Sequence, residues 1–93
     1  FGFSLILKNE LSGMRRELIT RLDAAGIQSP PIVAGNFTRN PVLTHLRHKD
    51  FPHLPNAEKV HFDGLFVGNH HYPMQNQVDL LVNVLKEFEE TYA

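Results

Sequence analysis

Hydrophobic residues alternate along the first few positions of the chain and then recur at helical spacing. Phe3, Leu5 and Leu7 alternate with their neighbours, which predicts a strand with at least one buried face. From Ser12, a candidate N-cap, apolar residues follow every three or four positions until Gly26, which suits the residue after a helix end. This pattern predicts a helix of roughly a dozen residues. Its apolar stripe consists of Met14, Leu18, Leu22 and Ala25.

A second apolar run, residues 27–33, predicts another strand. Pro30 and Pro31 remove two backbone donors from it, so we expect it at a sheet edge. The run ends at Gly35-Asn36, a pair that tolerates positive φ and therefore predicts a tight turn. Residues 42–46 then read as one or two helical turns.

The second half of the chain repeats the alternation of helix and strand. Pro55 suits the first position of a short helix that runs to Asp63 and is ended by Gly64. A third strand follows at residues 65–68, and Asn76 with Asp79 resembles a capping box. The last helix carries an apolar stripe of Val78, Leu81, Val82, Leu85, Phe88 and Tyr92. We expect it to bury Val78, Leu81, Leu85 and Phe88 and to leave Glu87, Glu89 and Glu90 in solvent.

The order strand, helix, strand, short helices, strand, helix predicts the fold class. It is typical of a two-layer α/β (α+β) domain. We expect a three-stranded sheet, two main helices on one of its faces, and short connecting helices.

Composition narrows the classes of function. The chain has 93 residues, enough for one small domain, and a formal charge of −1, which argues against a nucleic-acid surface. The absence of cysteine excludes disulfides and zinc–cysteine sites and agrees with a reducing compartment such as the cytoplasm. No apolar run is long enough to span a membrane. Because the sequence opens at Phe1 in the middle of an apolar strand, we expect it to belong to a longer polypeptide.

Recognised catalytic motifs are missing from this sequence. It has no phosphate-binding glycine loop and no nucleophile elbow. Six histidines are many for this length, but a zinc site needs three or four that converge, so structural roles are favoured and no metal is expected. The motifs alone predict an α/β module with polar loops.

Two polar loops carry the candidate binding residues. Each follows a strand that ends in Gly-Asn, and together they offer Asn36, Arg39, Asn69 and His70 for contacts with a sugar or phosphate. If the strands share one sheet, both loops could reach a cleft of the same or the neighbouring subunit. Arg39 is the strongest candidate, because a guanidinium can hold a phosphate through two hydrogen bonds. The alternative is that Arg39 pairs with an acidic residue on the surface.

Four segments resemble one known family in their order and spacing. They are residues 24–27 (AAGI), 31–41 (PIVAGNFTRNP), 54–58 (LPNAE) and 63–70 (DGLFVGNH). This pattern is similar to the C-terminal small domain of the DegT/DnrJ/EryC1/StrS family, whose members are pyridoxal-phosphate-dependent sugar aminotransferases and dehydratases with the type I aminotransferase fold. The versions found here look closest to the nucleotide-sugar 3-dehydratase branch.

The resemblance implies a function that this segment could serve only in part. It implies that residues 1–93 are the small domain of an enzyme that removes the C3 hydroxyl of a 4-keto-6-deoxyhexose, for 3,6-dideoxysugars of lipopolysaccharide. Pyridoxal or pyridoxamine 5′-phosphate would act as the electron sink. The catalytic and cofactor-binding residues would lie in a large N-terminal domain outside this chain, and the enzyme would be a cytoplasmic homodimer.

Three alternatives or departures remain open. A sugar 4-aminotransferase of the same family would carry a catalytic Lys where the dehydratases carry His, and that position precedes Phe1. A non-enzymatic α/β ligand-binding module is the reading from a different class. Relatives usually carry Arg where this chain has Pro30, which removes one cation from the expected ligand contacts.

Overall fold

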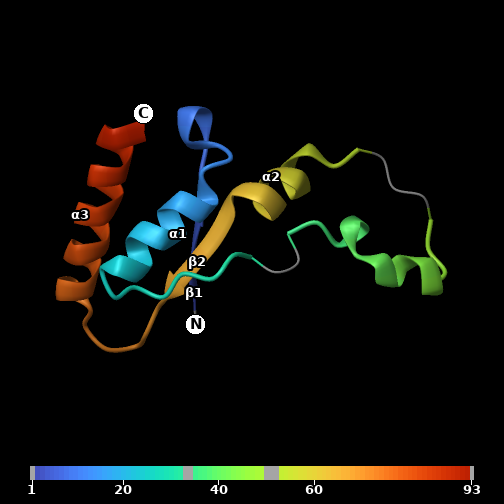
Figure 1. The fold of residues 1–93 in the computed structure, drawn as a ribbon. Coiled ribbons are helices and arrows are strands. Elements are labelled where there is room, and N and C mark those ends of the chain that lie inside the picture. The colour runs from blue at the N-terminus through green and yellow to red at the C-terminus, as the bar shows by residue number, and fades with distance from the viewer. Residues whose placement is uncertain (1, 33–34, 50–52, 93) are drawn as a thin grey trace.

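The computed structural model describes residues 2–32, 35–49 and 53–92. Two strands and three α-helices form the body of the protein, and three short 3-10 helices lie in the connections (Figure 1). In chain order they are β1 (Gly2–Ile6), η1 (Asn9–Leu11), α1 (Arg15–Ala24), η2 (Phe37–Arg39), η3 (Pro41–His45), α2 (Pro55–Asp63), β2 (Gly64–Gly68) and α3 (Gln75–Tyr92). The expected mixed fold with two main helices and short connecting helices is confirmed.

The sheet has two strands in the described residues, and the expectation of three is wrong. β1 and β2 pair antiparallel, with Gly2 opposite Gly68 and Ile6 opposite Gly64. On the other edge of β2, the predicted second strand is reduced to a single bridge between Pro31 and Leu65. Two further backbone bonds flank that bridge, from Ile32 N to the Gly64 oxygen (3.1 Å) and from Phe66 N to the Pro30 oxygen (3.0 Å). Prolines cannot donate to a ladder, which limits the pairing of residues 27–32, while Val33 of the predicted strand lies outside the described residues.

The core lies between α1, α3 and β2. Leu18 and Leu22 of α1, Leu65 of β2 and Phe88 of α3 have almost no exposed surface. Leu7, just after β1, joins this cluster, but β1 itself is mostly exposed, so the buried strand face expected there is confirmed only at its end. Two apolar layers, helices over a small sheet, therefore hold the domain together.

Helix α1 ends as the sequence predicts but begins differently. The expected N-cap, Ser12, lies before the helix and its hydroxyl donates to Asp63, whereas Met14 occupies the cap position. At the other end Gly26 has a φ of 82°. Its amide donates to the Asp23 oxygen and the Ile27 amide to the Leu22 oxygen, the paired bonds of a Schellman motif. A residue with a side chain would be strained at that φ.

Helix α3 corrects two details of the prediction. It begins at Gln75, so Asn76 lies inside the helix and forms no capping box. Phe88 is buried, with 1% of its surface exposed, whereas Val78 is 46% exposed, contrary to expectation. Leu81 and Leu85 pack partly against the core, and the three glutamates at 87, 89 and 90 are exposed as predicted. One side of the apolar stripe on α3 is therefore open.

Residues 35–49 extend away from this body as an arm (Figure 1). The arm contains η2 and η3, and its described residues are mostly exposed. It gives the molecule an elongated shape, with principal extents of 47 × 32 × 18 Å. The arm returns to the body through α2, which begins at Pro55 and ends at Asp63 as predicted.

Candidate functional site

The two pairs of candidate residues lie at opposite ends of β2. The segment that leads to Asn36 and Arg39 is antiparallel to β2, so it ends beside Gly64, the first residue of that strand. Asn69 and His70 follow Gly68, the last residue of the same strand. Antiparallel neighbours deliver their carboxyl ends to opposite edges of a sheet. The two loops are therefore separated within this domain, and the expectation that both reach a cleft of the same or the neighbouring subunit stays a prediction.

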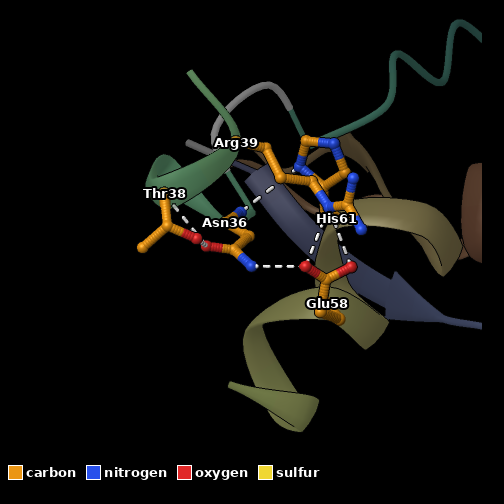
Figure 2. Close-up of polar contacts among 5 residues, drawn as sticks. All are labelled: Asn36, Thr38, Arg39, Glu58 and His61. Atoms are coloured by element: carbon orange, nitrogen blue, oxygen red, sulfur yellow. Dashed lines mark hydrogen bonds and ion pairs between the residues drawn. The ribbon is translucent and has the colours of Figure 1, made fainter. Parts of the chain in front are cut away.

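Asn36 is the residue that ties the arm to helix α2. It is buried, with 4% of its surface exposed, and it caps η2. Its side-chain oxygen accepts hydrogen bonds from the amide (3.0 Å) and hydroxyl of Thr38, while its Nδ2 donates to Glu58 Oε1 (2.8 Å). Both ends of the amide are therefore used within the protein (Figure 2). This arrangement fits a structural role for the Asn36 side chain.

Glu58 of α2 lies at the centre of the cluster. Arg39 Nε donates to both of its carboxylate oxygens, at 2.8 and 2.9 Å, and Figure 2 shows Asn36 and Arg39 converging on this carboxylate. The hydrogen bond from Arg39 lowers the pKa of Glu58 below its usual value, so the carboxylate is ionised at neutral pH. The surface ion pair considered as the alternative for Arg39 is thus formed.

Two aromatic rings of α2 complete the cluster. His61 Nδ1 accepts a hydrogen bond from the backbone amide of Asn36 (3.3 Å), so the ring proton of a neutral His61 sits on Nε2. Phe62 lies beneath Arg39, whose Cζ is 4.7 Å from the ring centroid, within the range of a cation–π contact. Glu58, His61 and Phe62 are three and four positions apart, so one face of α2 carries all three.

Gly35 allows this close contact between the arm and α2. A Cβ atom at this position would lie 2.5 Å from both Cα and N of His61, so no side chain fits. The backbone φ expected to be positive at Gly35 depends on Ala34, which lies outside the described residues, so that part of the expectation stays a prediction. Glycine is required at this position by space, and the chain bends there.

The C-terminal end of α2 is fixed by residues from α1 and the turn before it. Arg15 Nη1 donates to the backbone oxygen of His61 (2.7 Å), one of the last carbonyls of α2, and to that of Gly64 (3.1 Å), which follows the helix. Asp63 accepts hydrogen bonds from the Ser12 hydroxyl (2.5 Å) and the Gly13 amide (2.7 Å). These contacts set the position of the helix face that carries Glu58.

Asn69 and His70 border a separate, largely apolar groove of about 970 Å³ between the sheet and α3. Both residues are exposed, and the His70 ring stacks on Tyr72 with a centroid separation of 5.1 Å. The exposed side of the α3 stripe lines the groove, including Val78 and Val82. Phe3, Leu5, Phe66 and Met74 also line it.

Three residues of the first cluster escaped the sequence reasoning. Glu58, His61 and Phe62 lie about twenty positions from Asn36, and only the fold brings them together. The signal that could have found them is their spacing of three and four positions after the helix-starting Pro55.

The described residues show neither a cluster of metal ligands nor a membrane-spanning helix. Within ranges 2–32, 35–49 and 53–92, no group of three or more His, Asp or Glu side chains is placed to hold a metal ion. In the same part of the chain, no helix combines the length and the apolar character needed to cross a bilayer.

Proteins similar to this chain were found in both sequence and structure. It is 41% identical over 87 residues to GDP-4-keto-6-deoxy-D-mannose 3-dehydratase of Escherichia coli O55:H7, and 42% identical over 88 residues to the enzyme of that name from Yersinia pseudotuberculosis. These matches cover 92% and 94% of this chain but only 22% of each relative. The lipopolysaccharide biosynthesis protein RfbH of Salmonella typhimurium is 30% identical over 89 residues. No family model matches the chain.

Solved structures of the same enzyme agree with these matches. The E. coli 3-dehydratase with bound hydrated PLP superposes with a TM-score of 0.82 at 40% identity, covering 90% of this chain and 22% of that one. A second structure, with a trapped PLP–glutamate geminal diamine, gives a TM-score of 0.82 at 41% identity and also covers 22% of that chain. The resemblance to the nucleotide-sugar 3-dehydratases is confirmed. The chain therefore spans about a fifth of the length of these 3-dehydratases and has the fold of one segment of them.

Proposed function

We propose that this chain is the small C-terminal domain of a nucleotide-sugar 3-dehydratase that acts on a 4-keto-6-deoxyhexose in 3,6-dideoxysugar biosynthesis. The observation that supports it is the agreement of sequence and fold over nearly the whole chain: 41% identity across 92% of its residues and a TM-score of 0.82. The loop and strand motifs that carry the resemblance lie within the matched region. A homodimer and a cytoplasmic location are part of the same proposal.

Pyridoxal phosphate is bound in the related structures, but the residues described here do not form a site for it. Lys8, Lys49 and Lys86 are exposed, and Lys59 contacts the carboxylate of Asp63 at 3.5 Å. None of these amines is desolvated as a Schiff-base lysine would be. In the proposed enzyme the cofactor, held by the rest of the polypeptide, supplies the electron sink, and this domain contributes binding and shielding from water.

The groove beside α3 supports the proposal that a larger body covers this domain. Its lining is mainly apolar, and it includes side chains such as Val78 and Val82 that a complete core would bury. β1 begins at Gly2, opposite Gly68 at the rim of the groove, so a preceding chain would enter there. We propose that the large N-terminal domain of the same enzyme occupies this groove.

A pair of neighbouring substitutions tests the proposed cover. Val82 lines the groove, whereas Asn83 is exposed on α3 and does not. In the longer polypeptide, Val82→Glu should lower the melting temperature by several degrees because it places a charge in an apolar interface. Asn83→Glu should leave it unchanged. Equal effects of the two substitutions would contradict the proposal.

Turnover of a defined substrate tests the activity. The longer polypeptide, supplied with pyridoxamine phosphate and an amino acid as amino donor, should convert GDP-4-keto-6-deoxy-D-mannose into a product lighter by one oxygen atom, as mass spectrometry would show. The C3 hydroxyl is replaced by hydrogen, while the amino acid is oxidised to its 2-oxo acid and ammonia is released. A product that carries an amine at C4 would instead identify the 4-aminotransferase alternative. Ligand binding without turnover would favour the non-enzymatic module.

We propose ligand-binding roles for candidate residues at two separate places on the domain. Arg39 is half exposed at the surface of the arm, while Asn69 and His70 stand at the rim of the groove. The side chain of Asn36 has an indirect part in this proposal, because its hydrogen bonds hold the loop that carries Arg39. If the rim borders the sugar, Asn69→Ala and His70→Ala should each raise the KM for the nucleotide sugar.

A further inference from the structure

The guanidinium of Arg39 is held at one edge and on one face. Its Nε donates to Glu58, and Phe62 covers one face of the group. Within the described part of the chain, the two Nη groups make no hydrogen bond, and 49% of the side chain is exposed to solvent. The edge that remains is the one with two parallel N–H donors, which matches the oxygens of a phosphate or a carboxylate.

The residues that hold the guanidinium of Arg39 are themselves fixed by further hydrogen bonds. Glu58 accepts from Asn36 as well as from Arg39, and Asn36 is buried. The helix that carries Glu58 is in turn fixed at its C-terminal end by Arg15. An exposed arginine ordinarily samples many rotamers, and ordering it on ligand binding costs free energy. Here that ordering is already achieved before a ligand arrives.

Charge along the arm favours an anionic ligand despite Glu58. Residues 35–49 include Arg39, Arg47 and Lys49 and no Asp or Glu. Glu58 neutralises one of these cations from the α2 side, and the remaining charge keeps the potential on the arm positive. An anion is therefore attracted to the arm before it meets the two Nη groups.

We propose that the Nη edge of Arg39 binds an oxyanion of a substrate, with Glu58 and Phe62 as positioning residues. This inference rests on the proposed function, which offers two sources for the oxyanion: the diphosphate of the nucleotide sugar and a carboxylate of the amino donor. Both present paired oxygens that a guanidinium can hold through two hydrogen bonds. Lysine cannot replace it, because an ammonium group has no such fork.

The test uses the longer polypeptide and separates KM from kcat for each substrate. Arg39→Gln and Arg39→Lys should raise the KM for one of the two substrates about tenfold or more, with kcat nearly unchanged, as expected for a charge-assisted contact equally present in ground and transition states. Inhibition by inorganic pyrophosphate should weaken in parallel if the ligand is the diphosphate. Inhibition by glutarate should weaken instead if it is the carboxylate.

Variants of the positioning residues extend the same test. Glu58→Gln keeps an acceptor for Nε, so its KM should rise less than that of Glu58→Ala. Phe62→Leu keeps an apolar support but removes the aromatic face, and it should raise the same KM without affecting the other. A purely structural role would lower the melting temperature in these variants and leave the ratio of the two KM values unchanged.

Arg16→Gln is the matched control, because Arg16 is an exposed arginine of α1 that lies outside the arm. Unchanged KM values in both Arg39 variants, or an equal effect in Arg16→Gln, would overturn the inference. If the unmodified polypeptide turns over no nucleotide sugar, the proposed function fails instead. The oxyanion site is then decided by calorimetric titration of pyrophosphate and glutarate, where binding that is lost in Arg39→Gln supports it and no binding overturns it.

Discussion

Replacing Asp63 by Asn should destabilise the protein strongly at neutral pH. The Asp63 side chain is 5% exposed and accepts hydrogen bonds from the Ser12 hydroxyl (2.5 Å) and the Gly13 amide (2.7 Å). A hydrogen bond to a charged group contributes about 1.5–3 kcal/mol. Asn keeps one acceptor oxygen but turns an NH₂ group toward the other donor, so one bond is lost and the other weakened. We expect a loss of about 2–3 kcal/mol in the free energy of unfolding.

The dependence of this loss on pH distinguishes the charge from the shape of the side chain. Burial raises the pKa of Asp63, but the hydrogen bonds from Ser12 and Gly13, together with the nearby ammonium of Lys59, outweigh it, and the pKa is lowered. A carboxylate with a lowered pKa stabilises the folded state above its unfolded value of about 4, and this stabilisation is lost as the pH falls through the folded pKa. The difference between the wild type and Asp63→Asn should therefore be constant near neutrality and shrink below about pH 4.

Urea unfolding followed by circular dichroism between pH 2 and 7 would measure this effect, and amide hydrogen exchange at Gly13 would localise it. Asp79→Asn is the control, since Asp79 is an exposed residue of α3 that accepts a bond from Gln75. This variant should change the stability by less than about 0.5 kcal/mol. A loss for Asp63→Asn that is equally large at pH 2.5 and pH 7 would refute the reasoning, as would a loss no greater than that of the control.

Two further substitutions test the core and the arm. Phe88→Ala should cost about 3–5 kcal/mol, because the ring is 1% exposed among Leu18, Leu22 and Leu65; a midpoint of urea unfolding close to that of the wild type would contradict its place in the core. Gly35→Ala should cost about 1–3 kcal/mol, because its Cβ would lie 2.5 Å from the backbone of His61. Gly68→Ala is its control, since the nearest atom to that Cβ is the His70 ring at 3.5 Å, and equal thermal shifts for the two glycine variants would show that the clash is relieved at no cost.

Local signals in the sequence predicted the elements whose ends depend on backbone chemistry. Pro55 and Gly64 mark the two ends of α2 correctly, and Gly26 closes α1 in the left-handed conformation. The predicted strand at residues 27–33 forms a single bridge in its described part, residues 27–32, although its side chains suit a strand. Its two prolines have no N–H to donate to a ladder. This effect is larger than we predicted, since one bridge is formed there. Ser12 failed for another reason: a buried carboxylate from a distant segment uses its hydroxyl.

The sequence predicted the loop residues of the candidate site but not the residues of α2 that contact them. The loop that carries Asn36 and Arg39 was found from the residues that follow a glycine turn, but Glu58 was not, because nothing local connects positions 36, 39 and 58. Asn36 and Asn69 lie at opposite ends of β2, and the sequence did not predict this separation because it depends on strand direction. Hydrophobic periodicity shows that a strand exists but carries no information about whether its neighbour runs parallel or antiparallel.

The pairing of β1 with β2 also bears on how this segment forms during synthesis. Ile6 meets Gly64 and Gly2 meets Gly68, so roughly sixty residues must leave the ribosome before β1 finds its partner. Phe88, which completes the core beneath β2, emerges later still. Until then β1 is an unpaired apolar edge, a template for wrong pairing with other nascent chains. Chaperones that bind extended apolar segments should therefore engage β1 for most of the time in which this segment is translated, and release it only when α3 has emerged.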